Sequence, residues 1–470
     1  MPVPWGTAVL KDGSMFKNCC VIALLFALGG LMPLSRAEAP NAQAKFSVEQ
    51  LQEDFAFVKK SIARVHPEPS YSAEPHRMAL AFAKAQQQLQ KPQTRDEAWR
   101  VLAALNPVFS DAHLQVSMGE FDDEAAAHLK AGGGFFPYEV HVDPKGDLFV
   151  RSEVGGAATP FATARIDSIN GVPARKVTAA LLALAPGDSA ALRSNLLSGR
   201  WWRFYWRAFG TPKLFKLVLA QDKKQVRISR AAATRLPYVT SDDTDFAKAY
   251  RFEMLSPTVG LLTANTFLWP DKKLFYAFTE KMFGKLRDDK ASTLLIDIRD
   301  NTGGDDDMWK EGLLRYIADK PYQHGSTYRK MVIEGRASGT EKVGDIVEGK
   351  IQTWEQPEPN NPLHFSGKVY VLVGRTTYSS AILFSNTVQD FKFATVVGAA
   401  GYARARQSGG IQHMILPHTK LGVIVPRFVL DRPSGARTPE LIGPDIVMAD
   451  DPFTPRALID ALHARIVPPK

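Results

Sequence analysis

From about residue 250 onwards, short apolar runs alternate with segments of helical period. The predicted strands span residues 259–264, 293–298, 369–373 and 394–397, and the predicted helices span 273–286, 308–317 and 380–390. Strands that alternate with helices build a mostly parallel sheet through crossover connections. The sequence therefore predicts a layered α/β domain over residues 250–465. The polar segment 334–362 is rich in Gly and Pro and lacks a clear period, which indicates a surface insertion.

The first part of the chain after residue 44 has a helical pattern. Apolar residues recur there at three- and four-residue spacing, at Val48, Leu51, Phe55, Val58 and Ile62. Ser47 is placed to cap the first helix, and Thr94 to Glu97 forms a capping box that opens another. We expect an all-helical N-terminal cap over residues 45–116, which ends in a short strand at 113–116.

Residues 135–230 have a different period. Alternation of apolar and polar residues predicts strands at 138–142 and 214–219, so this region should be rich in β-structure. Within it, a strand at 164–169 is followed by the turn Asn170-Gly171 and a helical run at 177–184. This order resembles the carboxylate-binding strand-turn-helix of PDZ modules.

The N-terminal residues read as a secretory signal. Lys17 precedes an apolar run, and Ala37-Glu38-Ala39 is a small-x-small cleavage site. We therefore expect residues 1–39 to be removed on export, without a membrane span in the remainder. The alternative is a buried N-terminal helix, and translation can begin at Met1 or at Met15. Both cysteines, Cys19 and Cys20, lie in this segment, so the mature protein is expected to have no disulfide and no thiolate nucleophile.

Two strand-to-helix junctions of the α/β domain have an unusual composition. One is Asp297-Ile298-Arg299-Asp300-Asn301-Thr302-Gly303-Gly304, and the other is Gly374-Arg375-Thr376-Thr377-Tyr378-Ser379-Ser380-Ala381. Ligands of open sheets bind beyond the carboxyl ends of the strands, so both junctions point to one crevice. A serine at a helix start gains from exposed backbone donors, and a glycine pair allows backbone amides to approach a carbonyl. The plainer alternative is that Ser379 and Ser380 only cap a helix.

Taken together and in this order, these motifs and the Gln389-Asp390 pair resemble the tail-specific, or C-terminal processing, serine peptidases. The resemblance implies a crotonase-like α/β fold with a PDZ-like insertion. It also implies that Ser379 is the nucleophile, because the family's nucleophile lies eleven residues before this aspartate. The expected oxyanion donors are the amides of Ser380 and of Gly303 or Gly304.

The general base is predicted from a position at which this chain differs from the family pattern. The Ser-Lys branch of the family has a lysine where this chain has Arg404, and a guanidinium cannot accept a proton from a serine. The chain instead resembles the tricorn-type branch, which uses a histidine from an Asp-Gly-His-Thr-like loop. Asp111-Ala112-His113 matches that loop, so His113 is the expected base. The alternatives are that His113 only pairs with Asp111, or that His413 or His418 is the base.

A third group should hold the histidine in its productive tautomer. The family's histidine branch has a glutamate before a Gly-x-x-Pro-Asp segment, and Glu440 precedes Gly443-Pro444-Asp445 here at a shorter spacing. Glu440 is therefore the predicted orienting group, with Ser110 as a local alternative. The family's usual Glu-Thr-Gly-Gly is replaced by Ala399-Ala400-Gly401.

Composition and missing motifs exclude other classes. The net charge is +9, from 58 basic and 49 acidic residues, but the basic residues are interleaved with acidic ones, which disfavours nucleic-acid binding. A zinc helix, a phosphate loop and a dinucleotide fingerprint are missing from the sequence, so we expect no metal and no cofactor. The acidic run Asp305-Asp306-Asp307 is interpreted as complementing a helix dipole.

The sequence thus predicts an exported serine peptidase, periplasmic or secreted, that acts on polypeptides through Ser379 and His113. The alternative, favoured by Arg404 and the altered Gly401 loop, is a catalytically inactive secreted protein that binds a peptide or an apolar ligand on the same scaffold. An esterase or amidase for small molecules is a third possibility.

Overall fold

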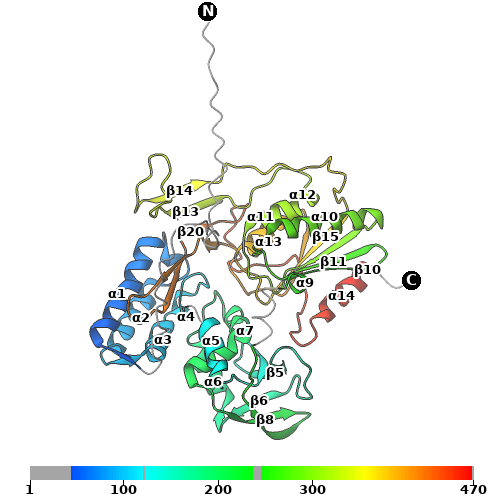
Figure 1. Cartoon of the computed structure of the whole chain (residues 1–470). Coiled ribbons are helices and arrows are strands. Elements are labelled where there is room, and N and C mark those ends of the chain that lie inside the picture. The colour runs from blue at the N-terminus through cyan, green and yellow to red at the C-terminus, as the bar shows by residue number, and fades with distance from the viewer. Residues whose placement is uncertain (1–43, 120–121, 237–244, 468–470) are drawn as a thin grey trace, which may run out of the picture. The chain divides into compact units, whose positions relative to one another are not determined.

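The computed structural model describes residues 44–119, 122–236 and 245–467, all within one compact unit (Figure 1). The predicted signal segment at residues 1–39 lies outside the described residues.

Among these residues, the helices are α1 (Val48–Val65), α2 (Pro75–Gln88), α3 (Arg95–Ala103), α4 (Asn106–Phe109), α5 (Asp122–Lys130), α6 (Ala174–Leu182), α7 (Ala190–Phe209), α9 (Phe246–Ala249), α10 (Lys272–Asp288), α11 (Asp306–Trp309), α12 (Arg315–Ile317), α13 (Ser380–Asp390) and α14 (Arg456–Ile466), with the 3-10 turn η1 (Pro69–Tyr71) and the π-helical turn η2 (Lys310–Leu314). The strands are β1 (Lys45–Phe46), β2 (Gln93–Thr94), β3 (Gln115–Ser117), β4 (Tyr138–Val142), β5 (Leu148–Glu153), β6 (Arg165–Ile169), β7 (Val172–Pro173), β8 (Leu214–Gln221), β9 (Lys224–Ala231), β10 (Tyr250–Ser256), β11 (Val259–Ala264), β12 (Thr293–Asp297), β13 (Thr327–Met331), β14 (Ile346–Lys350), β15 (Lys368–Val373), β16 (Thr395–Gly398), β17 (Gln407–Gly409), β18 (Gln412–Ile415), β19 (Gly422–Val425), β20 (Phe428–Leu430) and β21 (Ile446–Val447).

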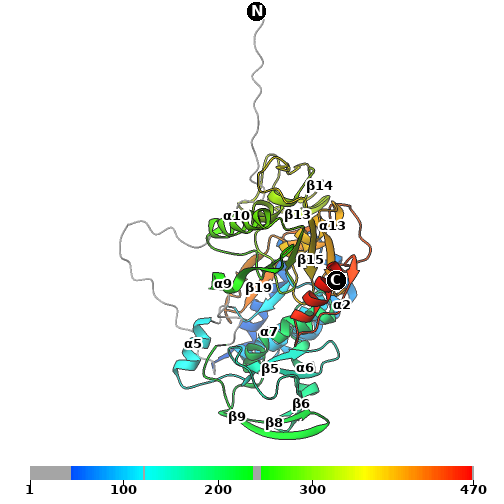
Figure 2. The ribbon, with the colours of Figure 1, turned by 90° about the vertical axis from the view of Figure 1, so that its right-hand side faces the viewer.

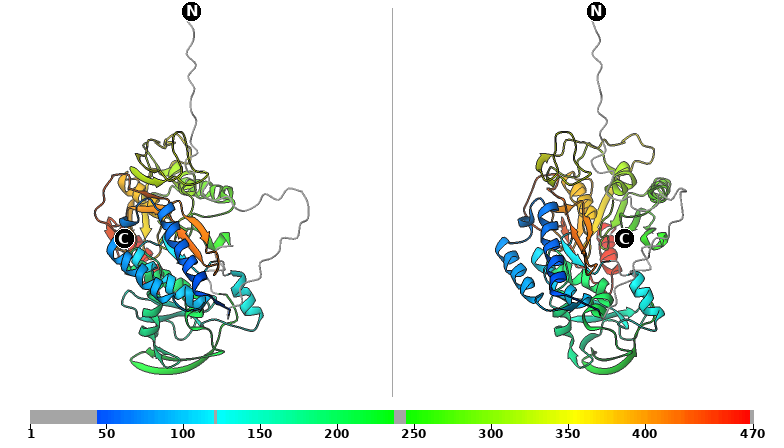
Figure 3. Two further views of the ribbon diagram at one scale, coloured as in Figure 1. Left: turned by 90° about the vertical axis from the view of Figure 1, so that its left-hand side faces the viewer. Right: turned by 60° about the vertical axis from the view of Figure 1, so that its left-hand side comes forward.

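The N-terminal helices begin where their capping residues predict. Both capping boxes are formed, by Ser47 with Gln50 before α1 and by Thr94 with Glu97 before α3. The region is not all-helical, however. β1 pairs with β2, and β3 joins a three-stranded sheet with β18 and β19 from late in the chain. Figure 3 shows α1 beside these late strands, where Asp54 accepts hydrogen bonds from the amides of His418 and Thr419.

Residues 138–231 form an antiparallel sheet of order β4-β5-β6-β8-β9, with β7 paired to β6 (Figure 2). The predicted Asn-Gly turn joins β6 to β7, and both Asn170 and Gly171 have positive φ angles, of 50° and 82°. The region also contains the 20-residue helix α7, which the period-two pattern did not predict. Its apolar side, including Leu197, Trp201 and Phe204, packs into the same core as the sheet.

The late part of the chain forms a sheet of order β10-β11-β12-β15-β16-β21, in which all pairs except β10 with β11 are parallel. Its inner strands β11, β12, β15 and β16 are largely buried, whereas the edge strands β10 and β21 are partly exposed. One face packs against α10, α11 and α13, and the other packs against α14 through Leu458 and Leu462 (Figure 2). A mixed α/β fold is therefore confirmed. The helix predicted over 308–317 is a helical run divided by the π-turn η2, and the predicted insertion contains the surface strand β14.

Candidate active site

The two junctions singled out in the sequence follow neighbouring strands. β12 and β15 are parallel partners, with Asp297 paired to Leu372, so the loops after them leave the same edge of the sheet. Backbone hydrogen bonds join these loops, from the amide of Thr376 to the carbonyl of Arg299 and from the amide of Tyr378 to the carbonyl of Asn301, at 3.0 Å each. The predicted crevice residues of the two loops are therefore held side by side.

Ser379 occupies a strained position at the start of α13. Its φ of 55° and ψ of −126° lie outside the regions that non-glycine residues ordinarily adopt, and its side chain makes no capping hydrogen bond. It is not a conventional helix cap, which would have extended backbone angles and a bonded hydroxyl. The conformation leaves the Ser379 hydroxyl without a hydrogen-bond partner among the described residues.

Gly303 lies directly against this serine. A Cβ atom on Gly303 would come within 2.6 Å of the Ser379 Cβ, and the φ of Gly303 is 102°. Both facts require glycine at this position. Gly304, with a φ of 141°, is packed equally closely against the backbone of Phe267.

The backbone amides near Ser379 are not equivalent. The amide of Gly303 donates to Asn301 Oδ1 at 2.8 Å and is thus occupied. The amides of Gly304 and Ser380 have no acceptor among the described residues. Ser380 is fixed through its side chain, whose hydroxyl contacts the Asp306 carboxyl group and accepts a hydrogen bond from Trp309 Nε1 at 2.9 Å. Of the predicted oxyanion donors, Gly304 and Ser380 remain available to a ligand.

His113 reaches this region from the loop before β3. Its ring packs on the ring of Tyr378, the residue before Ser379, with 4.7 Å between the ring centroids. Its backbone amide donates to Asp111 Oδ1 at 2.8 Å, and its Nδ1 lies 3.0 Å from the hydroxyl of Ser408. His113 Nε2 makes no hydrogen bond with a described residue. Burial lowers the pKa of His113 below the usual 6.5, against the opposing effect of Asp111, so the imidazole is neutral at neutral pH.

Two buried carboxyl groups, Asp111 and Asp188, lie beneath this contact. The hydroxyl of Tyr378 is 3.0 Å from Asp111 Oδ1 and 2.8 Å from Asp188 Oδ1, and the hydroxyl of Tyr71 donates to Asp111 Oδ2 at 3.1 Å. Burial, followed by the charge of Asp111, raises the pKa of Asp188 to about 7. Tyr378 thus bridges the two carboxyl groups, and Asp188 keeps its proton to a higher pH than an exposed aspartate does.

The structure does not bring Glu440 to His113. Glu440 is largely exposed, and its carboxylate pairs with Arg404 Nε at 2.7 Å. Arg404, at the position of the family's lysine, also contacts the carbonyl of Ser110 and donates its backbone amide to Asp188 Oδ2 at 2.9 Å. The Ser110 hydroxyl donates to the carbonyl of Asp188 instead of to the histidine. The group that faces His113 Nδ1 is Ser408.

The other two histidines considered as bases lie elsewhere. His413 is an exposed residue of β18, and His418 pairs with Glu53 of α1 at 2.6 Å. Sequence reasoning missed Asp188, Ser408 and Tyr71 because no motif marks them. Tyr378 stood inside a quoted motif, but nothing in the sequence indicated that its hydroxyl would bridge two carboxyl groups.

Among the described residues, no group of three or more His, Cys, Asp or Glu side chains is arranged to hold a metal ion. Every described helix is too short or too polar to cross a membrane. Asp305 caps α11 by accepting a hydrogen bond from the amide of Asp307, as the helix-dipole interpretation of the acidic run predicts.

Comparison with solved structures gives a fold relationship over most of the chain. Mature CPAF aligns with a TM-score of 0.60 and 14% identity, over 89% of this chain and 96% of the CPAF chain. CPAF in complex with lactacystin aligns with a TM-score of 0.62 and 14% identity, over 89% of this chain and 97% of the other. A serine-to-alanine mutant of CPAF aligns with a TM-score of 0.63 and 13% identity, over 89% of this chain and 96% of the mutant chain. At these identities the likeness shows the fold alone.

Comparison with protein families is more specific to the site. No curated protein sequence matches this chain. The model described as Peptidase family S41 matches residues 258–448, which include Ser379, the Gly303-Gly304 loop and the neighbouring strands β12 and β15. The region that carries the candidate nucleophile is therefore similar to peptidase family S41, and this similarity supports a serine-type peptidase.

Proposed function

We propose that this protein is an exported peptidase that cleaves polypeptides with Ser379 as nucleophile and His113 as general base. The observation that carries the proposal is the backbone of Ser379. A serine held at φ 55° and ψ −126° at a helix start, with its hydroxyl unbonded, is strained for a reason other than capping. Such strain is commonly found at nucleophiles that turn from a strand into a helix.

The reaction proceeds by acyl transfer. Ser379 Oγ attacks the peptide carbonyl while its proton passes to His113 Nε2, and the tetrahedral oxyanion accepts hydrogen bonds from the amides of Ser380 and Gly304. His113 then protonates the leaving amine. Water hydrolyses the acyl-enzyme with the same imidazole as base. The exposed amides at the start of α13 favour the developing negative charge.

Ser408 supports this role of His113 in place of Glu440. A hydroxyl 3.0 Å from Nδ1 accepts the Nδ1 proton of a neutral imidazole, which leaves Nε2 free to act as the base. The lowered pKa keeps the imidazole in its basic form. No hydrogen bond joins His113 to Ser379 among the contacts of the described residues, and we expect this bond to form with substrate, since catalytic hydrogen bonds often tighten only then.

The finer family features are part of the same proposal. We infer a crotonase-like catalytic layer over residues 250–465 and a PDZ-like module over 135–230, in which the strand-turn-helix of β6, Asn170-Gly171 and α6 engages a polypeptide chain. Export to the periplasm or the exterior rests on the signal-like residues 1–39.

One observation favours the alternative, a catalytically inactive binding protein on the same scaffold. Arg404 replaces a lysine of the Ser-Lys branch and is bound to Glu440 and Ser110, so it supplies no base. A binding protein would retain the crevice without an activated hydroxyl.

A serine-directed fluorophosphonate probe separates the two functions. Labelling of the wild-type protein at Ser379, together with loss of labelling and of casein hydrolysis in Ser379→Ala, supports the peptidase. Thermal unfolding of Ser379→Ala should remain cooperative, which excludes misfolding. Hydrolysis that persists in Ser379→Ala rules out the assigned nucleophile, and a folded wild-type protein that is not labelled supports the binding protein.

A further inference from the structure

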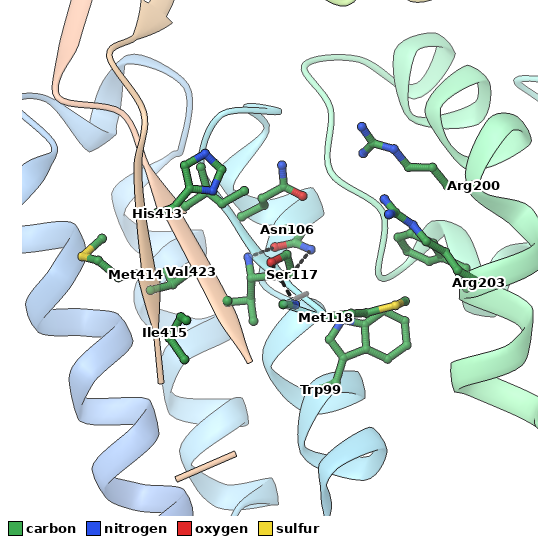
Figure 4. Close-up of a pocket in the computed structure, with 16 residues that line it drawn as sticks. Trp99, Asn106, Ser117, Met118, Arg200, Arg203, His413, Met414, Ile415 and Val423 are labelled. Atoms are coloured by element: carbon green, nitrogen blue, oxygen red, sulfur yellow. Dashed lines mark hydrogen bonds between the residues drawn. The ribbon is translucent and has the colours of Figure 1, made fainter. Parts of the chain in front are cut away.

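A pocket of about 330 Å³ lies between the three-stranded sheet β18-β19-β3 and helix α7, next to the segment that carries His113 (Figure 4). Trp99, Asn106 and Phe204 line it together with residues of the sheet and two arginines of α7. The pocket begins two residues after His113, since Gln115 is a lining residue and its side chain donates to the carbonyl of Ala112 at 2.7 Å.

The pairing register shows which side of the sheet is free to meet a ligand. Val116 and Val423 are paired and point into the hydrophobic core. Side chains alternate along a strand, so Gln115, Ile424 and His413 point to the opposite side. Ile415 on that side is 57% exposed. The free side of the sheet therefore presents apolar groups together with the polar side chains of Gln115 and His413.

The outer edge of β3 is not available for an added strand. Asn106 accepts a hydrogen bond from the amide of Val116 at 2.7 Å and donates to its carbonyl at 3.0 Å. This side chain satisfies the backbone groups that an incoming peptide strand would need. A ligand of the pocket must be held by side chains.

The pocket is lined by basic residues and by no acidic ones, since its lining includes Arg200 and Arg203 and contains neither Asp nor Glu. These arginines are three residues apart on α7, and Figure 4 shows both side chains extending from the helix toward the sheet. Arg200 has no hydrogen-bond or ion-pair partner among the described residues, and its burial lowers its pKa. Arg200 is partly exposed, so its unpaired guanidinium can bind an anion that enters the pocket.

We propose that this pocket binds a carboxylate of the polypeptide substrate through Arg200, with the apolar walls receiving the neighbouring side chains. Arginine presents a planar pair of N–H donors that matches a carboxylate. The occupant is an acidic side chain of a peptide segment that also contains apolar residues. This proposal rests on the proposed function and assigns that site a preference for acidic substrates.

The test measures binding without hydrolysis. Immobilised Ser379→Ala protein is mixed with decapeptides of random flanking sequence that carry Glu or Gln at the centre, all with amidated C-termini, and bound peptides are quantified by mass spectrometry. We expect Glu peptides to be enriched about tenfold over Gln peptides. The enrichment should disappear in the Ser379→Ala/Arg200→Gln protein. It should persist with Arg227→Gln, which removes the same charge from an exposed position of β9.

A second arm identifies the source of the carboxylate. In this arm, Gln-centred peptides with free C-termini replace the amidated peptides. If only these peptides are enriched, and only when Arg200 is present, the pocket binds a chain terminus and not an acidic side chain. Equal binding of all sets, or enrichment that survives Arg200→Gln, overturns the proposal. Arg200→Gln should leave the melting temperature unchanged or raise it, and a clear decrease would show a structural partner for Arg200 and count against a ligand. Because none of these readouts needs catalysis, failure of the peptidase assignment is seen separately in the fluorophosphonate experiment.

Discussion

The imidazole of His113 packs against the ring of Tyr378 with 4.7 Å between the ring centroids. This contact joins the loop after the N-terminal helices to the residue that precedes the candidate nucleophile. The other end of the Tyr378 side chain is also fixed, because its hydroxyl contacts both Asp111 and Asp188. The candidate base and nucleophile are thus placed by a buried network that the sequence motifs do not reveal.

The first prediction concerns the pH dependence of catalysis. The pKa of His113 is lowered by burial, so the basic imidazole persists to a more acidic pH than in an exposed histidine. We expect the acidic limb of the kcat/KM profile to have its midpoint below 6.5, the usual value for histidine. His113→Gln should reduce kcat/KM by about a hundred- to ten-thousand-fold and remove this limb. An unchanged profile in the variant would assign the limb to another group.

The second prediction concerns Ser408 as a positioning residue. Ser408→Ala removes the oxygen that faces His113 Nδ1, and the loss of one hydrogen bond of about 1 kcal/mol should lower kcat roughly fivefold. KM should change little, since Ser408 is not expected to contact substrate. Glu440→Gln is the matched control, because Glu440 bonds Arg404 and not the histidine. A larger loss of kcat in Glu440→Gln than in Ser408→Ala would restore Glu440 as the orienting group.

The third prediction concerns stability and pH at Asp188. Its folded pKa is raised from 3.8 to about 7, so the folded protein keeps a proton that the unfolded chain releases. The contribution of Asp188 to the free energy of unfolding is therefore complete at low pH and declines as the pH rises toward 7, by on the order of 4 kcal/mol. Above this range it is constant.

Asp188→Asn imitates the protonated carboxyl group and should remove this decline. Urea unfolding at pH 5 and pH 8 is the measurement, and the variant should gain stability relative to wild type at the higher pH. Asp319→Asn, at an exposed position, serves as the control. If Asp188→Asn and Asp319→Asn changed the pH dependence of the free energy of unfolding by the same amount, the effect would not come from the buried pair of carboxyl groups.

The fourth prediction concerns the contact of Gly303 with the nucleophile. Gly303→Ala places a methyl group 2.6 Å from the Ser379 Cβ at a φ of 102°, so we expect a loss of about 1–3 kcal/mol in stability and at least a hundredfold fall in kcat. Gly284→Ala is the control within helix α10. It has nothing within 4 Å of the added methyl and should stabilise the protein by about 0.5–1 kcal/mol. Wild-type activity in Gly303→Ala would mean that this loop does not border the reaction site.

Local sequence determined the elements whose signals are local. The capping boxes at Ser47 and Thr94, the Asn170-Gly171 turn and the buried strands of the parallel sheet form as expected, because each depends on hydrogen bonds or burial within a few residues. The parallel order of β12 and β15 then brings together the loops of Gly303 and Ser379. That is why the two junction motifs could be placed at one edge of the sheet from sequence.

Tertiary structure decided the remainder. The pairing of β3 with β19, the contact of His113 with Tyr378 and the bridge from Asp111 to Asp188 join residues far apart in the chain. Helix α7 is amphipathic within a region whose strands alternate. Glu440 pairs with the Arg404 guanidinium, which lies 36 positions earlier in the chain. Such contacts depend on which surfaces are buried against each other, and that choice minimises the free energy of the whole fold and leaves no periodic mark in the local sequence.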